Sequence, residues 1–528
     1  MSQGQRQGPV LILNEDSERT QGRDAQNTNI NAGKAVAEAV RTTLGPQGMD
    51  KMLVDDMGEV VITNDGVTIL QEMDVDHPAA QLIVEVAESQ EDTTGDGTTT
   101  AAVLAGQLLA QAETMVERDI HPRTIVDGYS EAARIATAEV DDLVLEGELD
   151  DDLLRRVATS SMTGKGTGEF DAADLAAVVV DAVSQVRDGD DVRREDVFIE
   201  AEMGASSKAT ELVSGMVVDQ EPARDGMPRS LEDATVLVLD APLEKRETAM
   251  SVEYNIDSTE QADAAREAER EEFRSYAEKL DEAGVDVLVT TDDVEDYVLD
   301  YLEDDGILTL DDVGSFSHDT GTHIAEATGA TLVGSLESID PDTLGTADSI
   351  RVETFGDETY TIVDGGEDAG VTTIFVRGGT SHVADEVERA IGDAVDVVAT
   401  AIAAGGVVPG AGATETKIAA RLRDEAAGVE GRKQLAVEAF ADAIETLPRT
   451  LAENTGMDQI DAVVDLRAAN EGDGLAGIIS HGETGELGDP VEHGVVDPAE
   501  VKRKAVENAT ESATLILRID DIISADLT

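Results

Sequence analysis

Apolar residues recur at helical spacing near both ends of the chain. Between Asp24 and Leu44 they fall three or four positions apart, and Gly45-Pro46 then ends the pattern as a helix C-terminus does. By the same spacing, further helices are predicted over about 78–91, 98–117, 123–145, 379–455 and 498–515. Both end segments are therefore predicted to be mainly helical.

The middle of the chain alternates between short β-rich runs and helical segments. Val236-Leu237-Val238-Leu239 is a clear strand, and further strands are predicted near 285–290, 306–310 and 331–334. Such alternation is typical of an α/β domain. We therefore predict a multidomain α+β fold, with one domain built from both chain ends and another inserted between them.

A β-hairpin is predicted early in the chain. Val60-Val61-Ile62-Thr63 and Val67-Thr68-Ile69-Leu70 are both β-rich, and the short loop Asn64-Asp65-Gly66 separates them. Two such runs around an Asn/Asp/Gly turn favour a hairpin, with Asp65 at its tip.

The segment 257–282 is a helix with little to bury. Its narrow apolar stripe consists of Phe273, Tyr276, Ala277 and Leu280. The remaining positions are mostly charged, so a solvated surface helix is the simpler interpretation. A helix this long with so small an apolar face is also expected to project from its domain, where a partner can reach it.

The net charge of the chain limits the classes of molecule that it can bind. The 528 residues include 114 acidic and 38 basic ones, for a formal charge of −76. Nucleic acid and anionic membranes would be repelled, so neither is predicted as a partner. The chain is longer than a single hydrophobic core normally organises, which suggests two or three domains.

The acidic residues are spread over every segment, Lys is scarce, and aromatic residues make up 2%. Molar salt would screen the self-repulsion of such a surface, so we predict a halophilic, archaeal protein. The absence of Cys excludes disulfides and Cys nucleophiles. Because no signal peptide is visible and Val397–Val408 is too short to span a bilayer, we expect a cytoplasmic location.

The strongest chemical signal is Gly95-Asp96-Gly97-Thr98-Thr99-Thr100, which leads into an apolar helical segment. Free backbone N–H groups at a helix start favour anions, and glycines let a ligand approach the backbone closely. Asp96 offers a hard oxygen ligand for Mg²⁺. The motif predicts a phosphate and metal site, although an ordinary capped helix after a Gly turn would have a similar sequence.

Four other sites carry weaker signals. Asp65 alone is typical of a turn, and Asp393 alone is typical of a solvated helix position. The glycine-rich break over 405–412 is compatible with a close-packed turn. The loop around Lys165 is not a P-loop, because the glycine spacing and the residue after the Lys differ from that motif.

Taken in order, several motifs resemble the group II chaperonins, which are the archaeal thermosomes and their eukaryotic cytosolic relatives. These motifs are Arg41-Thr42-Thr43-Leu44-Gly45-Pro46, Gly48-Met49-Asp50-Lys51-Met52, Asn64-Asp65-Gly66, the Gly95–Thr100 motif, Ser160-Ser161-Met162-Thr163-Gly164-Lys165, Leu239-Asp240-Ala241-Pro242-Leu243-Glu244, Val376-Arg377-Gly378-Gly379-Thr380 and Ala513-Thr514-Leu515-Ile516-Leu517-Arg518-Ile519-Asp520-Asp521. The resemblance covers essentially the whole chain. The middle of this chain is far more acidic than is usual in the family, so client preference cannot be carried over.

The resemblance implies an ATP-driven protein-folding chamber of two stacked rings, with three domains per subunit. They would be a mainly helical equatorial domain (1–149 and 405–528), a small α/β intermediate domain (150–215 and 369–404) and an α/β apical domain (216–368). The apical domain would carry a helical protrusion over about 250–282 that serves as a built-in lid. Clients would dock on apical helices near 292–304 and 317–328.

The resemblance also implies roles for individual residues. Asp96 would be the Mg²⁺ ligand, with the phosphates cradled by Gly97, Thr98 and Thr99. Asp65 and Asp393 would orient and activate the attacking water, Asp393 reaching it only when the intermediate domain closes.

The other implied residues surround the nucleotide. Leu44, Gly45 and Pro46 would border it from a helix end, and Lys165 would sense the γ-phosphate. Gly412 and Asp497 would contact the adenosine end.

The implied cofactors are ATP/ADP and Mg²⁺, with K⁺ as a further candidate. The implied partners are unfolded client proteins and identical or paralogous subunits, in rings of eight or nine. A simple Mg-ATPase or small-molecule kinase is the alternative from another class, but it has no need of a projecting charged helix. A structural assembly without ATPase activity is disfavoured by the intact Asp65, Asp96 and Asp393. Group I chaperonins, which use a separate lid protein, are disfavoured by the built-in protrusion.

Overall fold

The computed structural model describes residues 18–54, 57–58, 60–73, 75–166, 170–189, 191–204, 206–244, 259–314, 320–356, 358–366, 369–481 and 484–524. The chain divides into two compact units, a first unit of residues 1–165 with 400–528 and a second unit of residues 166–399. Helix α11 (Ser381–Ala404) crosses the boundary between them.

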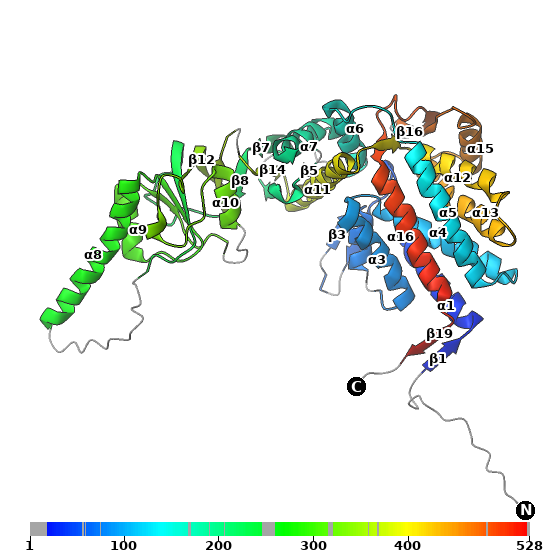
Figure 1. Cartoon of the computed structure of the whole chain (residues 1–528), viewed down its shortest axis with the longest axis horizontal. Helices are drawn as coiled ribbons and strands as arrows, with labels where there is room; N and C mark the ends of the chain where they lie inside the picture. The colour runs from blue at the N-terminus through cyan, green and yellow to red at the C-terminus, as the bar shows by residue number, and fades with distance from the viewer. Residues whose placement is uncertain are drawn as a thin grey trace, which may run out of the picture. The chain divides into compact units, whose positions relative to one another are not determined.

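Helices dominate the first unit (Figure 1). They are α1 (Arg23–Arg41), α2 (Gly66–Glu72), α3 (Pro78–Thr94), α4 (Thr98–Glu117), α5 (Pro122–Asp142), α6 (Asp151–Met162), α12 (Ala413–Ala426), α13 (Lys433–Ile444), α14 (Thr446–Asn454), α15 (Gln459–Ala469) and α16 (Ala499–Arg518). Apolar α4 lies at the centre, where it packs against α1, α3, α13 and α16. The first and last helices of the chain therefore share one core.

Short antiparallel strand pairs complete the first unit. They are β1 (Glu18–Gln21) with β19 (Asp521–Ser524), β2 (Lys51–Val54) with β3 (Val60–Thr63), β15 (Val407–Pro409) with β18 (Val496–Pro498), and β16 (Gly477–His481) with β17 (Thr484–Gly488). The pair β15–β18 joins the glycine-rich break after α11 to the segment just before α16, which brings two predicted site segments together.

The second unit is built on a six-stranded mixed sheet of order β11-β10-β9-β12-β13-β8. Its strands are β8 (Gly215–Val218), β9 (Ser230–Leu239), β10 (Val287–Thr290), β11 (Leu308–Leu310), β12 (Gly345–Phe355) and β13 (Glu358–Asp364). β9, β10 and β11 run parallel, connected through α8 (Thr259–Ala283) and α9 (Asp296–Asp305), as parallel strands require crossovers. Helix α10 (Thr320–Thr328) packs on β8 and β9.

A smaller sheet of order β6-β14-β7 accompanies it, made of β6 (Val197–Met203), β7 (Glu211–Val213) and β14 (Thr372–Gly378). The remaining elements are α7 (Ala172–Val186), the pair β4 (Arg187–Asp188) and β5 (Asp191–Val192), and short 3₁₀ helices at Arg194–Asp196, Ser207–Ala209 and Leu336–Ser338. The predicted α+β fold class is thus confirmed. None of the helices in the described part of the chain combines the length and hydropathy needed to cross a bilayer.

Helix α8 has the narrow apolar face that the sequence predicts. Its stripe of Phe273, Tyr276, Ala277 and Leu280 is buried, and Phe273 stacks on Tyr297 of α9 with ring centroids 6.3 Å apart. Most of the described positions before Phe273 are exposed, and Figure 1 shows this end of α8 extending away from the sheet. The predicted protrusion begins near residue 250, and residues 245–258 lie outside the described part.

Two predicted strands are wrong. Val67–Leu70 belongs to helix α2, and β3 instead pairs with the preceding strand β2. The β-branched run becomes helical because Asp65 caps it and because Val67, Ile69 and Leu70 are buried, so tertiary packing overrides local propensity. The strand near 331–334 is reduced to a single bridge between Val333 and Leu239.

Glu200 on β6 gives this unit a pH-dependent stability. Burial, followed by the carboxylates of Glu388, Asp219 and others, raises the pKa of Glu200 from 4.5 to about 7. The folded protein then binds this proton more tightly than the unfolded chain, so the free energy of unfolding falls as the pH rises through that window.

Glu200→Gln is therefore expected to stabilise the protein at pH 8 by about 1–2 kcal/mol, after allowance for partial solvent screening, and to have little effect near pH 4.5. Denaturant unfolding in concentrated KCl at both pH values would measure this. Glu232→Gln, at an exposed position of β9, is the matched control. Equal effects of Glu200→Gln at both pH values would contradict the assignment.

Candidate functional site

The Gly95–Thr100 motif forms the tight connection between α3 and α4. Gly95 ends α3 with φ 64°, and Gly97 begins α4 as its N-cap with φ 81°, both in the left-handed region that favours glycine. Gly97 has no side chain to cap the helix, so the first N–H groups of α4 remain available to an anionic ligand. Asp96, half-buried, lies between the two glycines.

Asp65 lies beside this helix start, as the N-cap of α2. Its Oδ2 accepts hydrogen bonds from Thr68 N at 2.8 Å and from Thr68 Oγ1 at 2.7 Å. A Cβ on the next residue, Gly66, would lie 2.3 Å from Thr99 Oγ1 and 3.1 Å from Thr98 Oγ1. Only glycine fits this contact, which places the Asp65 backbone against the first turn of α4.

The Lys165 loop closes on the same region. Asn64 Nδ2 donates to the carbonyl oxygen of Gly164 at 2.8 Å. A Cβ on Gly164 would lie 2.9 Å from Pro46 Cα, so this loop also contacts the end of the Leu44–Pro46 segment. The three segments that carry Pro46, Asp65 and Lys165 therefore meet.

Helix α14 connects the Leu44–Pro46 segment to Gly412. A Cβ on Gly45 would lie 2.3 Å from Leu451 Cδ2, and one on Gly412 would lie 3.4 Å from Leu451 Cδ1. Asn454 Nδ2 donates to the Leu44 carbonyl at 2.8 Å. Gly412 is the left-handed N-cap of α12, which repeats the arrangement of Gly97 on α4.

Asp497 on β18 is held by Lys502, a largely buried lysine of α16. Lys502 Nζ lies 2.8 Å from Asp497 Oδ2 and 2.8 Å from Glu415 Oε1. Burial alone would lower the pKa of Lys502, but the two carboxylates outweigh it and raise the pKa, so the ammonium stays charged. Asp497 Oδ2 would lie 3.1 Å from a Cβ on Gly410, so this carboxylate adjoins the glycine-rich break.

Asp393 is placed differently from the other predicted site residues. It lies half-buried on α11, within the second unit, whereas the others all belong to the first unit. Its predicted participation in the site therefore remains a prediction.

The donor set fits a magnesium–nucleotide. Within the described ranges, no three His, Cys, Asp or Glu side chains are grouped to hold a metal ion. Mg²⁺ is usually held by one or two carboxylates together with substrate phosphates, so Asp96 beside an anion-binding helix start suits it. When bound, the ion would neutralise phosphate charge, while Gly97, Thr98 and Thr99 would bind and orient the phosphates.

Sequence reasoning missed Gln90, Leu451 and Lys502, which support the predicted residues, and it named Asn64 only as part of a turn, without its contact to Gly164. Gln90 had a visible signal, because it follows Ile83, Val86 and Ala87 at helical spacing on the apolar face of α3. A polar residue on a core face needs a buried partner. Leu451 had no such signal, because Gly45 and Gly412 are distant from it in the sequence. Lys502 had none either, because one of its two partners, Glu415, is equally distant.

Comparisons with known proteins show the family of this chain. The model of the TCP-1/cpn60 chaperonin family matches residues 36–526. Thermosome subunit 3 of Haloferax volcanii is 60% identical over 521 residues, which is 98% of this chain and 99% of that protein. Thermosome subunit alpha of Halobacterium salinarum is 46% identical over 527 residues, covering 99% of this chain and 93% of that protein. Thermosome subunit beta of Methanothermobacter thermautotrophicus is 45% identical over 525 residues, which is 99% of this chain and 96% of that protein.

A nucleotide-driven protein machine is the class that fold and site define together. The chain belongs to the TCP-1/cpn60 chaperonin family. The predicted resemblance to group II chaperonins of the haloarchaeal type is confirmed, and with it the function of an ATP-hydrolysing chaperone. The alternative of a small-molecule kinase is therefore not supported.

Proposed function

We propose that this chain uses Mg-ATP bound at the start of α4 to drive enclosure of unfolded proteins within a double ring. One observation carries this proposal: Pro46, the Asp65-Gly66 turn, the Gly97–Thr99 helix start and the Lys165 loop converge in the first unit. Phosphoryl transfer needs such positioning and charge neutralisation rather than a covalent nucleophile.

We assign the residue roles by the resemblance to the chaperonin family, and the arrangement in the first unit is compatible with them. Asp96 holds Mg²⁺, and Lys165 approaches the γ-phosphate from its loop. Asp65 is fixed through Oδ2 by Thr68, and we assign its Oδ1 to the attacking water. Asp393 completes the site when the domain that carries it closes, which makes hydrolysis depend on closure.

We assign the adenosine end to Gly412 and Asp497. Leu44, Gly45 and Pro46 border the nucleotide from a helix end, and Leu451 supports Gly45 and Gly412. Lys502 keeps the Asp497 carboxylate in place. ADP uses the same contacts, and K⁺ is a further candidate ligand at the phosphates.

The domain assignment extends the two compact units to three domains. The equatorial domain comprises 1–149 and 405–528, the intermediate domain 150–215 and 369–404, and the apical domain 216–368. Helix α8 with the segment before it forms the lid, and clients dock near α9 and α10. The partners are unfolded proteins and identical or paralogous subunits, in a salt-rich cytoplasm.

Electron microscopy of the purified protein in concentrated KCl with Mg-ATP tests the assembly. End-on views of stacked rings are expected and would give the subunit number directly. Transfer to dilute buffer should dissociate or unfold the particles, because a charge of −76 is then unscreened. Small particles in high salt, even after addition of a paralogous subunit, would contradict the ring assignment. Greater stability in dilute buffer would contradict the halophilic assignment.

A further inference from the structure

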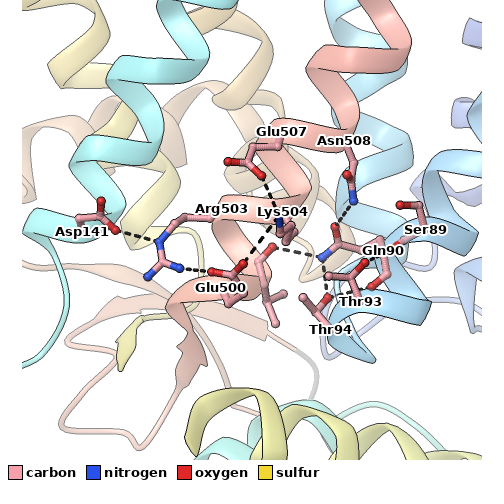
Figure 2. Close-up of polar contacts among 11 residues, drawn as sticks. Ser89, Gln90, Thr93, Thr94, Asp141, Glu500, Arg503, Lys504, Glu507 and Asn508 are labelled. Atoms are coloured by element: carbon pink, nitrogen blue, oxygen red, sulfur yellow. Dashed lines mark hydrogen bonds and ion pairs between the residues drawn. The ribbon is translucent and has the colours of Figure 1, made fainter. Parts of the chain in front are cut away.

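Gln90 is a fully buried amide on α3 that binds the underside of the Gly95–Thr100 loop. Its side chain has 0% exposure. Its Nε2 lies 3.0 Å from the Asp96 carbonyl oxygen, 2.9 Å from Thr94 Oγ1 and 3.2 Å from the Val501 carbonyl oxygen of α16. Its Oε1 accepts from Asn508 Nδ2 at 3.1 Å. Figure 2 shows Gln90 reaching from α3 toward Thr94 on one side and Asn508 of α16 on the other.

The Asp96 carbonyl is held from two sides. Besides Gln90, Thr94 Oγ1 lies 3.0 Å from the same oxygen. In a trans peptide the C=O and the following N–H point in opposite directions. With the Asp96 carbonyl directed at the buried amide, the N–H of Gly97 points away from the core, on the side where α4 begins.

Gly97 packs closely against the same Gln90 side-chain amide. A Cβ on Gly97 would lie 2.8 Å from Val501 Cγ1 and 3.1 Å from Gln90 Nε2. Its left-handed backbone therefore packs directly on Gln90 and α16. The amide group thus fixes both the orientation of the Asp96–Gly97 peptide and the space in which it lies.

We propose that Gln90 is a positioning residue for metal–nucleotide binding, acting by holding the Asp96–Gly97 peptide in its ligand-binding orientation before Mg-ATP arrives. This inference rests on the proposed function of Asp96 and Gly97. A preformed loop avoids the entropy cost of ordering it on binding. Since Gln90 also binds α16 through Val501 and Asn508, the loop is set against the last helix of the chain.

Gln90→Met keeps the length of the side chain and removes its donor and acceptor groups. In the assembled protein in concentrated KCl, it is expected to raise the Mg²⁺ concentration for half-maximal ATP turnover about 10-fold, with turnover at saturating Mg²⁺ changed less than threefold. The matched control is Asn508→Ala, which breaks the fourth contact of the same amide without touching the loop. It should lower the thermal midpoint similarly and leave the Mg²⁺ dependence within twofold.

Equal Mg²⁺ dependence in Gln90→Met and Asn508→Ala would overturn the inference and leave Gln90 a structural residue. If Gln90→Met does not assemble, Thr94→Val removes the second donor to the Asp96 carbonyl together with one acceptor of Gln90 Nε2, and it should give a smaller shift in the same direction. No shift would again overturn the inference. The proposed function fails separately, if the unmodified protein shows no Mg²⁺-dependent turnover or if Asp96→Ala leaves that dependence unchanged.

Discussion

Replacing Asp393 with Ala is expected to leave ATP binding within about threefold of normal and to lower ATP turnover by about 10²-fold or more. In the proposed mechanism the carboxylate acts on the attacking water, which takes part in the transition state but does not contribute to nucleotide affinity. Asp393 lies on α11 in the second unit, whereas the Gly95–Thr100 motif belongs to the first unit. Phosphate release under single-turnover conditions and calorimetric titration with ATP would measure the two effects separately.

Asp385→Ala is the matched control for Asp393→Ala. Asp385 is an exposed carboxylate two turns earlier on the same helix. Its removal changes the local charge equally and should leave turnover within twofold. Turnover near normal in Asp393→Ala would remove Asp393 from the mechanism. A parallel loss of binding and turnover would mean that Asp393 supports the fold of the site instead.

Asp96→Ala is expected to weaken Mg-ATP binding by about 10- to 100-fold, because the metal loses its protein oxygen ligand. The effect should depend on the ion. Without Mg²⁺, in excess chelator, the variant and the unmodified protein should bind ATP with similar affinity, since the proposed phosphate contacts at the start of α4 are unchanged. Titrations with and without Mg²⁺ would measure this difference.

The control for Asp96→Ala is Asp92→Ala, which removes an exposed carboxylate near the end of α3. It should leave both affinities within twofold. Unchanged Mg-ATP affinity in Asp96→Ala would show that the metal is held elsewhere. Equal weakening with and without Mg²⁺ would point to repulsion or collapse of the loop rather than loss of a metal ligand.

Prediction from the sequence was most accurate where the signal was local and periodic. The start of α3, both bounds of α4 and the exposed N-terminal half of α8 follow from the spacing of apolar residues, whereas α3 runs to Thr94, beyond its predicted end near residue 91. The motif at Gly95–Thr100 identified a helix start because glycine and threonine have specific backbone roles there. The error at Val67–Leu70 arose where two local signals conflicted: β-branched residues favoured a strand, while the Asp65 cap and burial against neighbouring helices favoured α2.

The candidate site was predicted by residue type but not by arrangement. Sequence motifs picked out Asp65, Asp96 and Lys165 individually, through their resemblance to a family. Their convergence depends on contacts such as Asn64 with Gly164 and Gly66 with Thr99, which join segments far apart in the chain. The spacing of apolar residues does not predict such contacts, because they depend on how whole helices pack against one another.

The sequence by itself determined the family, most helices and the acidic composition, since each depends on residue type or on neighbours within a few positions, and it predicted the phosphate-binding motif. Only the tertiary structure decided that Gln90 supports Asp96 from below, that Leu451 supports both Gly45 and Gly412, and that Lys502 holds Asp497. The reason is physical. A helical pattern shows which face is buried, but the atoms that face meets are set by long-range packing of the first and last segments of the chain around α4.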